Sequence, residues 1–270
     1  MLPAGTMLMR SRLLGQVDGV LHAFTTRRHG VSHPPYDSLN MGLHVGDNPN
    51  AVIENRRRAV AALGFTLDAW VSGEQVHGTR IIRVTADDKG KGALRHDDAV
   101  RGVDGLVTDA DGVLLAGYFA DCVPVFVVDP QGPRVGLAHA GWRGTLGNVV
   151  GNLLAALAGA YGTDPAGVWV WIGPAIGPCC FQVGPDVADR FRAAGLEACV
   201  IGGEKPSVDL PAANRQLLIA AGVPGNRIEV SGDCTACRTD RYFSHRVLGP
   251  RTGRMAALLG IAADRQDSAP

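Results

Sequence analysis

Two histidines and one cysteine are the residues of this 270-residue chain whose types suggest a shared chemistry. His77 lies in a short polar segment, Cys122 precedes an apolar run, and His139 follows a second apolar run. Two imidazoles and one thiolate suit a borderline-soft divalent ion such as zinc. Three protein ligands leave a coordination position for water or substrate, which is typical of catalytic zinc. The sequence therefore predicts one metal site with an open position.

A predicted β-hairpin brings two of these residues together. Residues 123–128 and 135–138 are apolar runs of strand length, and the segment between them holds two prolines and a glycine, which predicts a turn. Cys122 precedes the first strand and His139 follows the second, so both lie at the same end of the hairpin. His77 stands at the edge of another β-rich stretch and is expected to join them.

Spacing alone leaves two other interpretations open. In the first, Cys122 is a small buried side chain and the two histidines are hydrogen-bonded polar groups of the core. In the second, Cys122 is a nucleophile whose thiol pKa is lowered by His139, as in a cysteine hydrolase.

Two arginines are candidates for binding an anion. Arg27 follows a predicted strand, and its guanidinium offers a planar fork of donors suited to phosphate or carboxylate. Arg143 precedes a predicted helix at residues 145–161, whose N-terminal N–H groups and dipole also favour an anion. A solvated surface position is the alternative for each arginine.

Four of the other cysteines are expected to be inert thiols, and Cys179 and Cys180 are also expected to be buried. Cys179 and Cys180 are adjacent, and a vicinal disulfide or added metal ligation are the alternatives. Cys234 and Cys237 have the spacing of a redox pair or of half a zinc knuckle, but no second Cys-x-x-Cys pair accompanies them. Six cysteines in 270 residues are too few for a disulfide scaffold, so they are expected to be reduced.

The composition indicates an ordered domain and limits the partners. Apolar residues make up 46% of the chain and charged residues 19%, which is enough for a substantial core. Twenty-six basic side chains balance twenty-six acidic ones, so neither nucleic acid nor an anionic membrane is an expected partner. No signal peptide and no apolar run of about 20 residues is found, and we expect a cytoplasmic location.

The expected fold is α/β (α+β): a single domain with mixed β-sheets flanked by helices. The expected domain spans residues 18–262, after an N-terminal segment at 1–17 and before a flexible tail at 263–270. The patterns predict strands at 20–26, 106–109, 113–120, 168–172, 227–230 and 255–262, and helices within 48–64 and at 145–161, 185–194 and 211–221. The strands 106–109 and 113–120 are expected to form a hairpin around residues 110–112.

Motifs along roughly residues 18 to 260, in the same order, closely resemble the laccase-domain family. The matching segments are Thr25-Thr26-Arg27, Tyr36-Asp37-Ser38-Leu39-Asn40-Met41-Gly42, His44-Val45-Gly46-Asp47, Asn55-Arg56, Gln75-Val76-His77-Gly78, Asp104-Gly105, Asp121-Cys122-Val123-Pro124, His139-Ala140-Gly141-Trp142-Arg143-Gly144, Gly173-Pro174-Ala175-Ile176-Gly177-Pro178 and Cys237-Arg238. Members were first described as multicopper polyphenol oxidases and now look like zinc-dependent purine nucleoside phosphorylases; some relatives are thought to edit peptidoglycan precursors.

This resemblance implies phosphorolysis of adenosine, inosine or methylthioadenosine to a free base and ribose 1-phosphate, with adenosine deaminase side activity. It implies a laccase-domain fold and a zinc ion, or copper, held by His77, Cys122 and His139. Cys122, Arg27 and Arg143 become the catalytic candidates, and Arg27, Asn40 and Arg143 the substrate-binding ones. The partners are then a purine nucleoside and phosphate, while the sequence makes no prediction of oligomeric state.

Three rival functions remain. Copper-dependent phenol oxidation would need several coppers and more clustered histidines than the sequence holds. A cysteine hydrolase would use Cys122 and His139 without metal. A zinc-stabilised interaction domain would have no activity at all.

Overall fold

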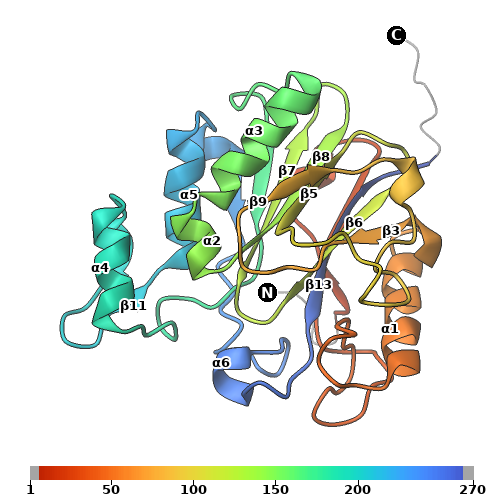
Figure 1. The fold of residues 1–270 in the computed structure, drawn as a ribbon, viewed down its shortest axis with the longest axis horizontal. Helices are drawn as coiled ribbons and strands as arrows, with labels where there is room; N and C mark the ends of the chain where they lie inside the picture. The colour runs from red at the N-terminus through yellow and green to blue at the C-terminus, as the bar shows by residue number, and fades with distance from the viewer. Residues whose placement is uncertain (1–5, 264–270) are drawn as a thin grey trace.

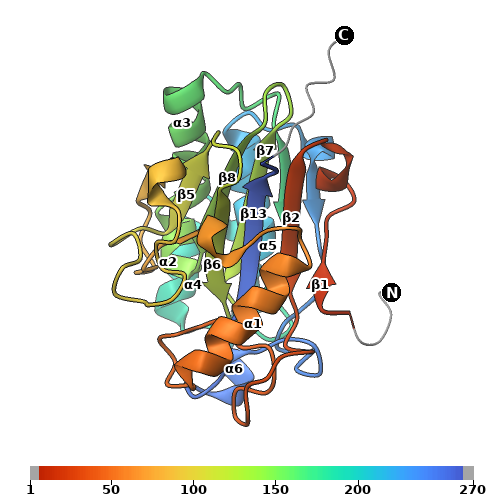
Figure 2. The same ribbon diagram turned by 90° about the vertical axis from the view of Figure 1, so that its right-hand side faces the viewer.

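The computed structural model describes residues 6–263, so the predicted tail lies outside the described residues except for Ala263. Two β-sheets pack face to face and helices cover their outer faces, which gives four layers (Figures 1 and 2). The helices are α1 (Pro49–Ala61), α2 (Trp142–Leu146), α3 (Val149–Tyr161), α4 (Pro185–Ala193), α5 (Leu210–Ala220) and α6 (His245–Leu248). This mixed arrangement confirms the predicted fold class.

The strands belong to two large sheets and one small one. The five-stranded sheet has the order β1 (Leu8–Met9), β2 (Val20–Thr25), β13 (Met255–Ile261), β6 (Leu114–Phe119), β3 (Trp70–Ser72). The six-stranded sheet has the order β12 (Ile228–Val230), β9 (Trp169–Ile172), β7 (Val123–Asp129), β8 (Arg134–Ala140), β5 (Gly105–Thr108), β4 (Ile81–Arg83). The small sheet pairs β10 (Val200–Ile201) with β11 (Ser207–Val208).

Three hydrophobic clusters fill the spaces between the layers. One lies between the six-stranded sheet and α3 and α5, one between the two sheets, and one under α1. In β13, Leu258 belongs to the cluster under α1, and the next residue, Leu259, belongs to the cluster between the sheets. Because successive side chains of a strand point to opposite faces, a strand buried on both sides is apolar throughout.

The predicted hairpin is confirmed and positions the site. β7 pairs with β8 in antiparallel register, with Val123 opposite Ala140 and Pro124 opposite His139. Cys122, just before β7, therefore lies beside His139 near the end of β8.

The prediction that residues 106–109 and 113–120 form a second hairpin is wrong. β5 pairs with β4 and β8, whereas β6 pairs with β3 and β13 in the other sheet. The turn at residues 110–112 leads from the six-stranded sheet to the five-stranded one. There the N–H of Gly112 donates to the carbonyl of Ile261, in β13, at 2.8 Å. Both strands are apolar on both faces, so their pattern does not show which sheet each one joins.

The predicted single helix at 145–161 is two helices, α2 and α3. Asn148 has a left-handed φ of 57°, and its side chain accepts from Gly151 N at 3.1 Å, so it caps α3. A Cβ at Gly147 would lie 2.5 Å from the Thr79 side chain, so the break is closely packed.

Arg56 of α1 points inward. Its guanidinium is 1% exposed and donates to the carbonyls of Met41, Gly92 and Ala93 and to the Tyr118 hydroxyl. The charge is thus satisfied by neutral acceptors, and Arg56 joins α1 to the loops near the site.

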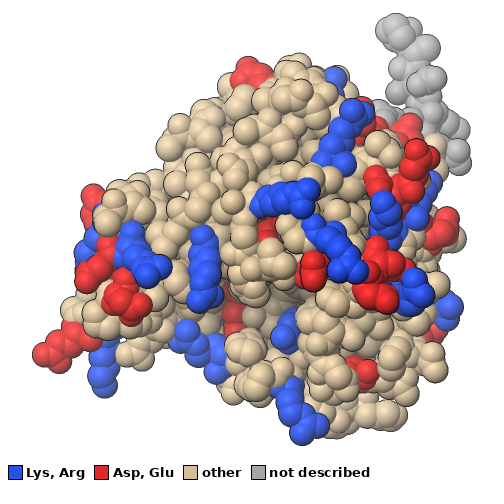
Figure 3. Space-filling view, in the orientation of Figure 1, with Lys and Arg blue, Asp and Glu red and all other residues tan. Residues whose placement is uncertain are grey.

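Charged side chains of both signs are interspersed over the face seen in Figure 3, in keeping with the balanced composition. Among residues 6–263, no helix is both long enough and apolar enough to cross a membrane.

Candidate metal centre

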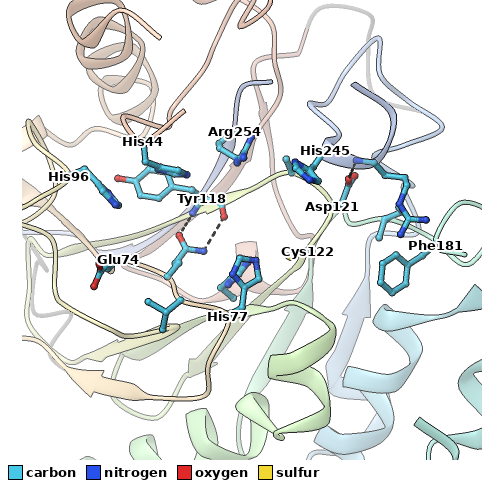
Figure 4. Close-up of a pocket in the computed structure, with 16 residues that line it drawn as sticks. His44, Glu74, His77, His96, Tyr118, Asp121, Cys122, Phe181, His245 and Arg254 are labelled. Carbon is cyan, nitrogen blue, oxygen red and sulfur yellow. Dashed lines mark hydrogen bonds between the residues drawn. The ribbon is translucent and has the colours of Figure 1, made fainter. Parts of the chain in front are cut away.

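A cavity of about 550 Å³ lies where the ends of β6, β7, β8 and β13 meet the loop at residues 74–78, the loop after β9, and α6 (Figure 4). His77, Cys122 and His139 lie on its wall. Figure 4 shows His44, His96, Tyr118 and Glu74 on one side of His77 and Cys122, and His245, Asp121 and Phe181 on the other. The volume is in the range of small-molecule sites.

The structure brings the three predicted metal ligands together. One ligand atom from each of His77, Cys122 and His139 lies within 4.8 Å of the other two. The two rings stand edge to face, with centroids 4.9 Å apart. A Cβ at Gly141 would lie 3.1 Å from Cys122 Sγ and 3.2 Å from His77 Cδ2, so glycine leaves space beside these donors. The donor set and this space fit a zinc-like ion.

Asp104 organises two of the three ligands, a role that the sequence analysis does not assign to it. Its Oδ1 accepts from His139 Nδ1 at 2.8 Å, so Nε2 is the ring nitrogen left to face an ion. The same carboxylate accepts from the backbone N–H groups of Val76, His77 and Gly78. These bonds hold the turn in which His77 has a left-handed φ of 60°. A carboxylate that fixes a histidine in this way also raises its basicity toward the metal.

Replacing Asp104 with asparagine is expected to weaken metal binding about 10- to 100-fold, because the carboxylate that orients His139 is lost. The measurement is the free zinc concentration that gives half-maximal activity in a zinc buffer. Asp109→Asn is the matched control, since the Asp109 carboxylate lies on the surface in an ion pair with Arg83. An unchanged zinc requirement in Asp104→Asn would contradict this role.

Cys122 and His139 also form an ion pair when no metal is bound. Burial tends to raise the pKa of the Cys122 thiol, but the charge of His139 and hydrogen bonds from both histidines outweigh it, so the pKa is lowered. Burial tends to lower the pKa of His139, but the thiolate and Asp104 outweigh it, so the pKa is raised. Cys122 is therefore a thiolate at neutral pH, the form that binds metals and attacks electrophiles.

In the metal-free protein, Cys122 should react with iodoacetamide at neutral pH faster than an ordinary cysteine. A lowered thiol pKa means that the thiolate persists to lower pH, so the pH midpoint of alkylation should lie below the value of about 8.5 for free cysteine. In His139→Gln, the midpoint should move up. Mass spectrometry of the peptide that holds Cys122 separates it from the other cysteines. Equal midpoints in the two proteins would show that His139 does not stabilise the thiolate.

Asp121 ties other segments to the site. Its φ is 92°, and its carboxylate accepts from Thr235 Oγ1 and from the backbone N–H of Arg246, both at 2.7 Å. The latter bond is drawn in Figure 4. Asp121 therefore joins the start of β7 to α6 and to the segment after β12.

The three predicted anion and substrate residues lie outside this cavity. Arg27 lines a separate surface hollow, where it pairs with Asp37 at 3.3 Å. Arg143 is exposed and stacks over the Trp142 ring, 4.4 Å from its centroid. Asn40 is buried, and its Oδ1 accepts from the backbone N–H of Arg254 at 2.9 Å. It thus supports a residue of the cavity without lining it.

Arg254 is the cavity residue that sequence reasoning missed most clearly. It stands just before β13, and Nη1 donates to the carbonyls of Thr252 and Gly253. Among the described residues, the hydrogen bonds of its side chain use Nη1 alone, which leaves Nε and Nη2 for a ligand. His44 lines the same cavity, with its ring 5.6 Å from that of Tyr118. No spacing in the sequence links residues 44 and 254.

Gln75 fixes the loop that carries His77. Its side-chain amide donates to Tyr118 O at 3.0 Å and its oxygen accepts from Tyr118 N at 2.7 Å, as the dashed lines in Figure 4 show. The Gln75 amide thus bonds the N–H and the carbonyl of one β6 residue, as the backbone of a neighbouring strand would, and holds the loop to β6.

Comparisons with known proteins find similar chains that match over most of their length. A family described as "Multi-copper polyphenol oxidoreductase laccase" matches residues 21–262. A protein of Geobacillus stearothermophilus named purine nucleoside phosphorylase YlmD is 47% identical over 247 residues, 90% of each chain. Purine nucleoside phosphorylase YfiH of Escherichia coli is 36% identical over 250 residues, 91% of this chain and 96% of that one.

A solved structure has the same fold. The crystal structure of YlmD from Geobacillus stearothermophilus superposes with a TM-score of 0.90 and 43% identity, covering 97% of this chain and 98% of the other.

Proposed function

The chain belongs to the multi-copper polyphenol oxidoreductase laccase family, and we propose that it is a zinc-dependent purine nucleoside phosphorylase. The proposed substrates are adenosine, inosine and methylthioadenosine, which give a free base and ribose 1-phosphate. The naming of its relatives supports an enzyme of this kind. The observation that carries the proposal is the convergence of His77, Cys122 and His139 on the wall of a cavity of nucleoside size.

His77, Cys122 and His139 would hold the ion, and Asp104 would keep His139 in one tautomer. When bound, a divalent ion with an open position supplies Lewis-acid polarisation and a water of lowered pKa. The protein's own groups then bind and orient the substrates.

We assign phosphate binding to Arg254. Its guanidinium is the permanent positive charge at the cavity wall next to His44 and Tyr118, and two of its nitrogens are free of protein acceptors among the described residues. Charge-assisted hydrogen bonds from a guanidinium suit phosphate oxygens. Arg246, the other cavity arginine, likewise has its Nη1 on two carbonyls, but its side chain is exposed and lies over the Phe181 ring, whereas Arg254 is partly buried.

The purine would lie against the apolar part of the wall. Val76, Ile176 and Phe181 line the cavity, and Val76 is 53% exposed. Covering such surface with a base is favourable at about 25 cal/mol per Å².

Products formed from adenosine with and without phosphate test this function. We expect adenine and ribose 1-phosphate in equal amounts, only when phosphate is present and only before treatment with a chelator. Adenine formed equally well without phosphate would indicate a hydrolase instead. We also propose an adenosine deaminase side activity, as the family resemblance implies, and inosine formed without phosphate would measure it.

A cysteine hydrolase is the second candidate, because the Cys122 thiol carries a lowered pKa beside His139. It would act without a metal, so activity that survives complete metal removal would favour it. Oxidation of phenols by the copper-loaded protein is the third candidate, and absence of all these activities would leave an interaction domain.

A further inference from the structure

Four cysteines form a second cluster of metal-binding side chains, apart from the cavity. Cys179 and Cys180 lie in the loop after β9, and Cys234 and Cys237 lie after β12. Their Sγ atoms all lie within 4.8 Å of one another. The expectation that Cys179 and Cys180 are buried is wrong, since Cys179 is exposed and Cys180 is only partly buried. The expectation that Cys234 and Cys237 are inert rested on the lack of a second Cys-x-x-Cys pair. In the structure, the adjacent cysteines Cys179 and Cys180 supply the second half of the cluster instead.

The sulfur separations fit ligands of one ion better than disulfides. Cys237 Sγ lies 3.5 Å from Cys179 Sγ and 3.4 Å from Cys180 Sγ. Four sulfurs bonded at about 2.3 Å to one zinc ion stand about 3.8 Å apart in a tetrahedron. A disulfide bond is about 2.05 Å long and joins only two sulfurs. Cys237 instead stands almost equally close to two partners.

The backbone around the cluster is built to hold the sulfurs. Ala175 and Cys234 form an isolated parallel bridge, which places the two loops side by side. Each loop then turns back, since Cys180 N donates to Gly177 O and Arg238 N donates to Cys234 O. Gly177 N also donates to Cys234 Sγ at 3.2 Å. An N–H directed at sulfur favours the thiolate form that a metal requires.

Gly177 leaves room for this close approach. A Cβ at this position would lie 3.4 Å from Cys179 Sγ and 3.3 Å from Cys234 Cβ. The contact with Cys234 is tighter than ordinary packing, and the contact with Cys179 is at its lower limit. A side chain at this position would therefore press on both halves of the cluster.

We propose that Cys179, Cys180, Cys234 and Cys237 bind one zinc ion in a structural site. Four thiolates form a closed tetrahedral set with no position for substrate, whereas a catalytic site keeps a position open. Thiolate ligands select zinc over magnesium and calcium, which prefer oxygen. The site is distinct from the one formed by His77, Cys122 and His139 and does not depend on the proposed function.

The position of the ion gives it a role in shaping the cavity. Ile176 and Phe181 of the first loop line the cavity, and Thr235 of the second loop donates to Asp121, next to Cys122. An ion that joins the two loops would hold this wall in place. Its loss should therefore lower the thermal stability and weaken nucleoside binding, but leave the three ligands of the other site intact.

The zinc content of purified variants tests the proposal. Relative to the wild type, Cys234→Ser/Cys237→Ser should contain one zinc ion less per chain, and Cys199→Ala should contain the same amount. Cys199 is a buried cysteine outside the cluster and is the matched control. His77→Ala should lose the other ion and keep this one, so failure of one site is distinguished from failure of the other. An unchanged zinc content in the double variant would overturn the proposal.

A second measurement needs no variant. Cys179 and Cys237 are exposed, so free thiols there should react readily with iodoacetamide. We expect both to be protected in the native wild-type protein and to react after a zinc chelator is added. Rapid alkylation before chelation would contradict the proposal, as would a non-reduced mass showing the loss of two hydrogens for each disulfide. Iron in place of zinc would contradict the assignment of the ion.

Discussion

Cys122→Ala should lower kcat/KM for phosphorolysis at least about a thousandfold, because a catalytic metal contributes several kcal/mol of transition-state stabilisation and each 1.4 kcal/mol is about tenfold. Removing the thiolate leaves only His77 and His139 at the site, so the zinc content should fall by one ion per chain. Steady-state kinetics and metal analysis of the same preparation measure both effects. Cys199→Ala is the matched control, since it removes a thiol elsewhere in the core and should change neither quantity.

The two measurements together separate a metal ligand from a nucleophile. If Cys122 were a nucleophile paired with His139, Cys122→Ala would lose activity while zinc remained at its wild-type content. Loss of zinc with retained turnover would contradict a catalytic metal altogether. A melting temperature close to that of the control shows that the variant is folded.

Arg254→Gln should lower kcat/KM for phosphate about 100- to 1000-fold, because two charge-assisted hydrogen bonds to the phosphate, each contributing about 1.5–3 kcal/mol, would be lost. Glutamine keeps a polar side chain of similar length but removes the permanent charge that would face the phosphate. The effect should be seen mainly in KM for phosphate, with a smaller change in KM for the nucleoside. Arg190→Gln on the exposed face of α4 is the control for loss of a charge.

The same kinetics decide between Arg254 and the two arginines suggested by the sequence. If phosphate binding belonged to Arg27 or Arg143, the corresponding glutamine variant would show the large rise in KM and Arg254→Gln would not. Arg254→Lys should recover part of the activity, since it restores the charge without the planar fork.

The convergence of the metal ligands could be predicted because it depends on local structure. The prolines and glycine between residues 128 and 135 fix a hairpin, and a hairpin necessarily brings Cys122 and His139 to one end. The position of His77 is harder to predict, because His77 lies in a loop that is held to β6 by the Gln75 side-chain amide. Its inclusion relied on residue type and on resemblance to a family.

The positions of Asp104 and Arg254 depend on contacts between distant segments, which periodicity does not encode. Asp104 reaches His139 across the pairing of β5 with β8. Arg254 enters the cavity from the start of β13, which lies between β2 and β6. Both strands are apolar on both faces, so the sequence pattern does not indicate which neighbours they take.

The cysteine cluster could not be predicted for the same reason. Cys179 and Cys237 are 58 residues apart, and they meet because β12 lies parallel to β9 and the loops after both strands leave the same edge. A search for two Cys-x-x-Cys pairs misses a site in which one half is a pair of adjacent cysteines.

The most direct test of the central claim is an anomalous difference map at the zinc absorption edge from crystals of the purified protein. A peak is expected between His77, Cys122 and His139, with the sulfur at about 2.3 Å and the two nitrogens at about 2.0–2.1 Å from the ion. One side of the ion should face the cavity without a protein ligand. A map with no peak among these three side chains, or a peak closed off by a fourth protein ligand, would contradict it.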